Sequence, residues 1–128
     1  MQYLLDTHVI IWFLKGDDYL PNSVKNIIDK KDNNIFICAI SLWEIAIKVK
    51  LGKLDLSMTF DDFIEWVSCG DFNIIPIENK HLKNLILLPP LHKDPFDRLI
   101  VATAQASDFI LITNDNDIHS YDISWIWT

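Results

Sequence analysis

Residues 94 to 106 predict a buried helix that carries a carboxylate in its first turn. Asp94 stands where an N-cap belongs, and Pro95 fits the first helical position, where its missing N–H leaves no bond unmade. The run from Leu99 to Ala106 is almost wholly apolar, so most faces of this helix should be buried. The helix dipole favours Asp97, but a carboxylate at the mouth of a buried helix must be hydrated, paired or bound to a cation. Asp97 is therefore the first candidate for a functional residue.

Apolar segments typical of strands alternate with segments of helical periodicity along the chain. Strands are expected at residues 3–5, 35–40, 72–77, 109–112 and 123–127, and helices at 8–14, 21–31, 41–50, 60–67, 80–87 and 94–106. The run 35–40 is apolar throughout, as in a strand buried on both faces, and Pro76 places its strand near a sheet edge. The length of 128 residues suits one domain, spanning 1–128. The alternation predicts an α/β fold with a mainly parallel central sheet.

The acidic charge balance narrows the choice of function. The chain has 18 acidic and 11 basic residues, which gives a net charge of −7 at pH 7. A protein that coats phosphates by electrostatics alone should be basic, so the balance argues against that class. An enzyme whose carboxylates hold a cation remains compatible with it.

Cysteine usage and hydropathy bear on the compartment. Cys38 and Cys69 lie among apolar residues without the spacing of metal ligands, so we expect two reduced, packed thiols. The N-terminal segment lacks the pattern of a signal peptide, and no apolar run approaches the roughly 18 residues of a membrane span. A cytoplasmic protein without a membrane segment is expected.

Four acids stand at or just after the carboxyl ends of predicted strands. They are Asp6, Glu44, Asp97 and Asp115, and the small polar residues Thr7, Ser41 and Thr113 stand close to three of them. In open parallel sheets ligands bind beyond these strand ends, so the four carboxylates should meet at one edge. Mutual repulsion would raise their pKa values and cost stability unless a cation lies among them. Oxygen ligands without paired Cys or His favour Mg²⁺ or Mn²⁺ over zinc.

Each acid also has an ordinary structural role open to it. Asp6 suits a helix N-cap, Ser41 and Glu44 match a capping box, Asp97 has Arg98 as a neighbour for pairing, and Asp115 lies in the turn-like run Asn114–Asp117. Asp117 in that run reads as a turn residue, although it lies close enough to Asp115 to compete for the fourth site position. Convergence of four separate segments on one edge favours the functional interpretation.

Five sequence blocks resemble one known family. They are Leu4-Leu5-Asp6-Thr7-His8, Ser41-Leu42-Trp43-Glu44-Ile45-Ala46-Ile47-Lys48, Leu51-Gly52-Lys53-Leu54, His92-Lys93-Asp94-Pro95-Phe96-Asp97-Arg98 and Thr113-Asn114-Asp115. In this order, and over nearly the whole chain, they resemble the PIN domain, and more narrowly the VapC-type toxins of bacterial toxin–antitoxin pairs. The blocks around Glu44 and Asp97 are the most specific.

The resemblance implies a three-layer α/β/α fold and a Mg²⁺- or Mn²⁺-dependent endoribonuclease. By position, the acidic quartet of the family falls on Asp6, Glu44, Asp97 and Asp115, and Thr113 matches its supporting hydroxyl residue. The quartet would hold metal, and metal-activated water would hydrolyse an RNA phosphodiester bond. The family also implies a cognate antitoxin as partner and a homodimer.

Basic residues near these acids are candidates for binding the substrate. Lys48, Lys50 and Lys53 lie around the end of the helix that carries Glu44, and Lys93 and Arg98 flank Asp97. They would form a basic rim around the acidic centre, or they are simply solvated; Arg98 would contact phosphate or pair with an acid. His8 and His92 fall near the predicted site, where surface or hydrogen-bonding positions suit them better than acid–base catalysis.

Two further classes of function compete with a nuclease. One is a PIN-fold module that binds a protein partner and keeps the acids as a structural cation site. The other is a phosphotransferase with Asp6 as nucleophile, which is disfavoured because His8 stands where a second aspartate is usual. The tryptophans, including Trp43, Trp125 and Trp127, are expected in the core or an interface rather than stacked on RNA bases.

Overall fold

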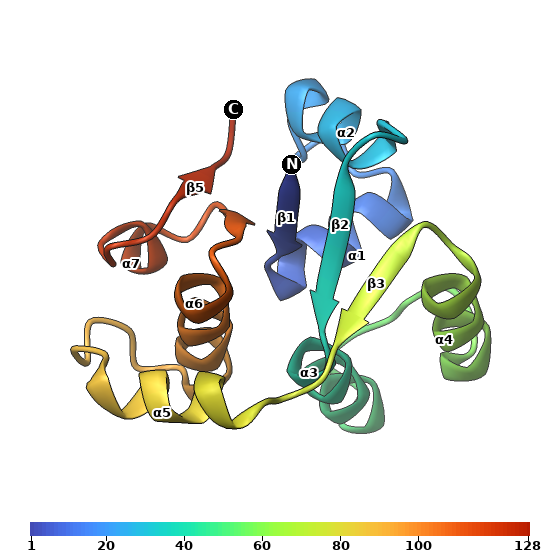
Figure 1. Cartoon of the computed structure of the whole chain (residues 1–128). Coiled ribbons are helices and arrows are strands. Elements are labelled where there is room, and N and C mark those ends of the chain that lie inside the picture. The colour runs from blue at the N-terminus through green and yellow to red at the C-terminus, as the bar shows by residue number, and fades with distance from the viewer.

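Five parallel strands form one sheet at the centre of the protein. The computed structural model describes all residues from 1 to 128. Its elements are β1 (Gln2–Leu5), α1 (Thr7–Lys15), α2 (Asn22–Asp29), β2 (Asn34–Cys38), α3 (Ala39–Lys50), α4 (Phe60–Cys69), β3 (Phe72–Ile75), α5 (Asn79–Leu87), α6 (Pro95–Ser107), β4 (Ile110–Ile112), α7 (Asn116–His119) and β5 (Trp125–Ile126) (Figure 1). The strand order is β3-β2-β1-β4-β5, and every neighbouring pair is parallel.

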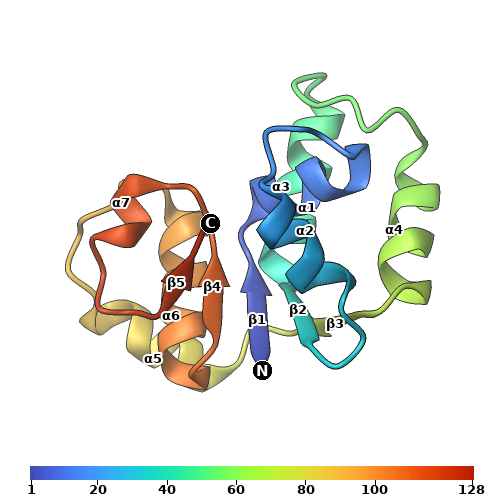
Figure 2. The same ribbon diagram turned by 90° about the horizontal axis from the view of Figure 1, so that it is seen from above.

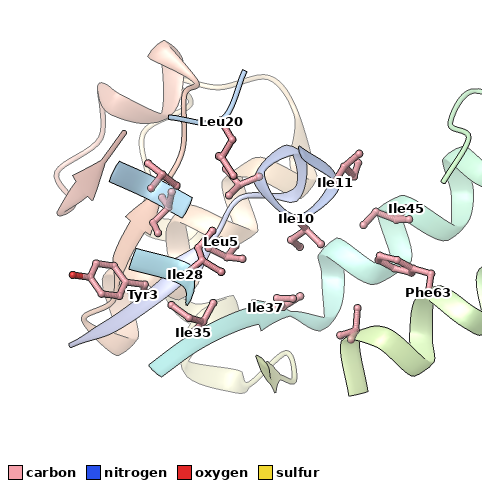
Figure 3. Packing of buried hydrophobic residues seen from close by; sticks show 14 of the residues in the cluster. Tyr3, Leu5, Ile10, Ile11, Leu20, Ile28, Ile35, Ile37, Ile45 and Phe63 are labelled. Atoms are coloured by element: carbon pink, nitrogen blue, oxygen red, sulfur yellow. The ribbon is translucent and has the colours of Figure 1, made fainter. Parts of the chain in front are cut away.

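Side chains of the strands alternate between two hydrophobic cores, one on each face of the sheet. Leu5, Ile37 and Ile112 face a core shared with α1, α2, α3 and α4 (Figure 3). Leu4 and Leu111 face a second core, filled mainly by the apolar side of α6 and by α7. Figure 2 shows the two groups of helices on either side of β1 and β4. The predicted three-layer α/β/α architecture with a parallel sheet is confirmed.

Most predicted helix ends are found where the sequence places them. The Asp94 carboxylate caps α6 by accepting the Phe96 N–H at 2.8 Å, and Pro95 is the first helical residue. Gly16 ends α1 with a φ of 62°, a left-handed conformation that costs glycine little. The predicted start of α3 at Ser41 is wrong, because this helix begins at Ala39 directly after β2. The predicted capping box of Ser41 and Glu44 is therefore wrong too, and Glu44 lies in the second turn.

Two further predictions are wrong. Cys38 is buried as expected, but Cys69 is exposed because it lies off the stripe that α4 buries. Trp43 is 59% exposed and Trp125 is 43% exposed, so neither belongs to the core, and the interface position expected as the alternative stays a prediction. The last strand is shorter than the predicted 123–127 and comprises only β5. No helix combines the length and apolar character that crossing a bilayer requires.

Candidate active site

The sheet brings the four predicted acids to its carboxyl edge. Asp6 follows β1 and caps α1, Glu44 lies in the second turn of α3 after β2, and Asp115 follows β4 and caps α7. Asp97 reaches the same edge from the first turn of α6, which runs antiparallel to the strands. Asp6, Glu44 and Asp97 are buried, whereas Asp115 is half-buried. Both interpretations of Asp6 hold, since the capping residue is also a member of the cluster.

Asp6 is held by hydrogen bonds from both ends of the chain. Its Oδ1 accepts the Thr7 N–H at 2.7 Å, and its Oδ2 accepts the Thr113 hydroxyl at 2.8 Å. Burial raises the pKa of Asp6, and the negative charge of Asp115 raises it further, although the hydrogen bonds and His8 oppose this. Thr113 is fully buried and also accepts the Asp115 N–H at 3.1 Å, so one hydroxyl positions two of the acids.

The hydroxyl groups of Thr7 and Ser41 hold the Glu44 side chain in place. The Thr7 hydroxyl lies 3.0 Å from Glu44 Oε1 and 2.9 Å from the Ser41 hydroxyl. Because a carboxylate only accepts and a hydroxyl has one proton, Thr7 donates to Glu44 and can accept from Ser41. The other carboxylate oxygen pairs with Lys48 Nζ at 2.9 Å. Lys48 thus neutralises one acid of the cluster.

His92 links the remaining two acids. Its Nε2 lies 2.8 Å from Asp115 Oδ2 and 3.1 Å from Asp97 Oδ2, and its Nδ1 accepts the Asp94 N–H at 3.0 Å. Because Nδ1 is an acceptor, the proton of the neutral ring is on Nε2, which can donate to either carboxylate. Burial lowers the pKa of His92, but Asp115 and Asp97 outweigh it, so the pKa is raised. The prediction of a hydrogen-bonding position is confirmed for His92, while His8 is exposed.

Asp97 is the acid of the site whose pKa is raised to a value near neutral pH. Burial raises the pKa of Asp97 to about 8, and the charges of Asp6, Asp94 and Glu44 add to this effect while His92 opposes it. No lysine or arginine pairs with Asp97, and the alternative of pairing with Arg98 is not realised. At neutral pH the Asp97 carboxyl therefore holds a proton in the folded protein, and a cation beside it would favour the ionised form.

Asp115 is joined to the other acids by His92 and by the Thr113 hydroxyl. The Asp115 carboxylate accepts hydrogen bonds from the backbone N–H groups of Asp117 and Ile118. Its other oxygen is hydrogen-bonded to the His92 ring. Burial acts to raise the pKa of Asp115, but His92 and these N–H groups lower it overall. Asp117 is exposed. It nevertheless lies near this group, because one carboxylate oxygen each of Asp117 and Asp115 and one ring nitrogen of His92 are within 4.8 Å of one another.

The predicted basic rim is realised only in part. Lys48 is committed to Glu44, and Lys93 lines a hollow of about 450 Å³ together with Glu44, Lys48 and Phe96. Lys50 is exposed at the end of α3, without an ion pair. Arg98 lies half-buried, and its Nε has no hydrogen-bond partner. Among the basic residues without an ion pair, Lys93 shares a hollow with Glu44.

The chemistry of these donors fits a divalent cation that prefers oxygen. Asp6 and Asp97 are buried, and the charge of Asp6 helps to raise the pKa of Asp97. Neither acid pairs with a lysine or arginine, and only Asp97 contacts His92. Carboxylates in this arrangement suit Mg²⁺ or Mn²⁺, and no thiol reaches them.

An all-parallel α/β/α sheet with carboxylates gathered at its carboxyl edge defines the class of this protein. The sequence matches the model of a family described as PIN domain over residues 3–124, and the chain belongs to that family. The family membership predicted from the sequence blocks is thus confirmed. No curated protein matches the sequence.

Several solved structures are similar to this chain. The first is the crystal structure of VapBC2 from Rickettsia felis bound to a promoter DNA fragment. It has a TM-score of 0.73 and 20% sequence identity to this chain, and the match covers 98% of each chain. A toxin–antitoxin complex from Klebsiella pneumoniae has a TM-score of 0.67 and 22% sequence identity, and the match covers 97% of this chain and 95% of that chain. VapBC-1 from nontypeable Haemophilus influenzae has a TM-score of 0.66 and 18% sequence identity, and the match covers 98% of this chain and 97% of that chain. At such identities the likeness demonstrates the shared fold.

Proposed function

We propose that the protein is a Mg²⁺- or Mn²⁺-dependent endoribonuclease that acts as the toxin of a toxin–antitoxin pair. The observation that carries the proposal is the group of Asp6, Glu44, Asp97 and Asp115 at one sheet edge, with the pKa of Asp97 raised to about 8. Membership of the PIN domain family supports nuclease chemistry, and the resemblance of the sequence blocks to VapC-type toxins favours RNA as the substrate.

The residues of the chain would divide the work as follows. Asp6 and Asp97 are the proposed principal metal ligands, and Glu44 and Asp115 act as further or water-mediated ligands. Thr113 orients Asp6, and Thr7 and Ser41 orient Glu44, so that these two carboxylates are held in place before substrate binds. A divalent cation held there supplies Lewis acidity, which polarises a phosphate oxygen and makes water a better nucleophile at neutral pH.

Substrate approach would use the free cations beside the acids. Lys93 and Lys50 are exposed, and we propose that they bind phosphates flanking the scissile bond. Replacing both with glutamate should weaken RNA cleavage and flatten its salt dependence, because fewer counterions are then released on binding. Unchanged cleavage and unchanged salt dependence would remove these lysines from the proposal.

The decisive test is cleavage of mixed cellular RNA by the purified protein with Mg²⁺, with Mn²⁺ and with EDTA. Asp6→Asn should abolish metal-dependent cleavage, whereas the matched control Asp61→Asn, an exposed acid at the start of α4, should cleave normally. Asp115→Asn and Asp117→Asn are compared in parallel, and only the former should impair cleavage. Absence of cleavage by folded wild-type protein with either metal would favour the protein-binding module.

An antitoxin is the partner that this proposal requires. The similar structures include toxin–antitoxin complexes, which supports a protein partner for this chain. The helix α5 exposes Ile86 by 84% and Leu87 by 80%, and large apolar side chains in such positions are typical of interaction surfaces. The predicted homodimer is tested by light scattering of the purified chain, and the antitoxin by growth rescue when the neighbouring gene is co-expressed.

A further inference from the structure

A hollow of about 210 Å³ opens directly beside the acid cluster. Five residues line it: Asp6, His8, Trp12, Asn114 and Asp115. Two of these are acids of the candidate active site, so whatever enters the hollow lies next to the proposed metal position. The hollow is smaller than the roughly 300–1,000 Å³ of pockets for drug-sized ligands. It therefore suits one planar ring whose remaining parts stay outside.

The aromatic side of this hollow is held in place from behind. His8 and Trp12 lie on successive turns of α1, with ring centroids 5.7 Å apart and planes inclined by 30°. Trp12 packs edge-on against Tyr19 at 4.6 Å and against Trp127 at 5.7 Å. His8 is exposed and Trp12 is half-buried, so both rings keep accessible surface toward the hollow. Trp12, which Tyr19 and Trp127 hold in place, loses little freedom when it stacks on a ligand.

Asn114 adds a polar group with a defined direction. Its Nδ2 donates to the Tyr19 hydroxyl at 2.6 Å, and Tyr19 itself packs on Trp12. The amide oxygen of Asn114 makes no hydrogen bond within the chain, so it can accept one from a ligand. Two planar rings beside a free amide oxygen match the needs of a heteroaromatic base, which presents a π face and N–H donors at its edge.

We propose that this hollow binds a nucleobase of single-stranded RNA next to the scissile phosphate, with His8 and Trp12 as the stacking surface and Asn114 as the contact to the base edge. The inference rests on the proposed function, because a phosphate held by the acids carries its own nucleoside to within reach of the hollow. Unpaired RNA bases are typically stacked on aromatic side chains, whereas bases in a duplex are not accessible. His8 and Trp12 are therefore positioning residues that favour single-stranded substrates.

The test measures base stacking separately from cleavage. A short single-stranded RNA that contains 2-aminopurine, whose fluorescence falls on stacking, is titrated with the full chain in Ca²⁺, and an abasic version of the RNA serves as reference. Loss of one stacking residue should weaken binding by about 5- to 150-fold. We expect His8→Ala and Trp12→Leu to show this loss and to lose the quenching. Trp125→Leu, which removes an exposed tryptophan outside the hollow, should bind like wild type.

Each outcome decides for or against the hollow. Equal affinity of wild type for the intact and the abasic RNA, or equal losses for Trp12→Leu and Trp125→Leu, would overturn the proposal. Trp12 also packs against the core, so a melting curve accompanies that variant, and the exposed His8→Ala keeps the test valid if Trp12→Leu unfolds. Stacking without RNA cleavage in Mg²⁺ or Mn²⁺ would refute the nuclease and retain the base-binding site. RNA cleavage without fluorescence quenching would support the nuclease and refute the base-binding site.

Discussion

Replacing Asp97 with asparagine should stabilise the protein in the absence of metal. The pKa of Asp97 is about 8 in the folded protein, against 3.8 for an ordinary aspartate. Between these values the unfolded chain is ionised while the folded one must hold a proton, so stability is complete at low pH and falls as the pH rises. Each pH unit in this window costs about 1.4 kcal/mol, which gives about 4 kcal/mol by pH 7 and about 2 kcal/mol after allowance for solvent screening.

The assay is urea unfolding of wild type and Asp97→Asn in EDTA at pH 4, 5.5, 7 and 8.5. The two proteins should be equally stable near pH 4, and the advantage of the variant should grow to about 2 kcal/mol at pH 7 and level off above pH 8. Adding Mg²⁺ at a hundredfold excess over its Kd should restore about 2.7 kcal/mol to wild type alone. Asp61→Asn, an exposed control, should show no such pH-dependent gain.

Two results would refute the electrostatic reasoning. A variant that is destabilised by more than about 1 kcal/mol in EDTA at pH 7 would mean that the Asp97 carboxylate makes a structural pairing, for example with His92, that asparagine cannot replace. A stability difference that does not change with pH would mean that Asp97 is ionised in the folded protein without penalty.

Four further substitutions test other parts of the structure. Thr113→Val removes the hydroxyl that bonds to Asp6, and urea unfolding should show a loss of about 1–3 kcal/mol together with reduced RNA cleavage. Gly16→Ala places a Cβ at a φ of 62°, so melting should reveal a loss of about 1 kcal/mol with cleavage unchanged. Trp43→Ser should shift the unfolding free energy by no more than about 0.5 kcal/mol, whereas Phe63→Ala in the core should cost about 3–5 kcal/mol in the same assay.

The positions of the acids follow from the sequence because a parallel sheet collects its strand ends at one edge. The strands were recognisable as apolar runs, and the residue after each run falls at that edge whatever the strand order. The order β3-β2-β1-β4-β5 itself carries no local signal, since it depends on which strands pair across the whole chain. The fold class was therefore predictable, and the strand order was not.

The ion pair of Lys48 and the exposure of Trp43 were predictable from residue spacing along α3. Lys48 follows Glu44 at a spacing of four residues, which on a helix favours the ion pair that forms. The exposure of Trp43 follows from the stripe that α3 buries at Ile40, Ser41, Glu44 and Ile45. In contrast, the position of His92 between two acids depends on the path of the loop between α5 and α6, for which helical or strand periodicity offers no guide.

The bond between the Thr113 hydroxyl and Asp6 joins residues 107 positions apart in the sequence. Proteins are synthesised from the N-terminus, so Asp6 leaves the ribosome long before the strand that supports it. The central strand β1 has only one neighbour until β4 has been made, and Asp115 comes later still. Until the ribosome has made Thr113 and Asp115, the nascent chain therefore carries Asp6, Glu44 and Asp97 without the residues that complete the acid cluster.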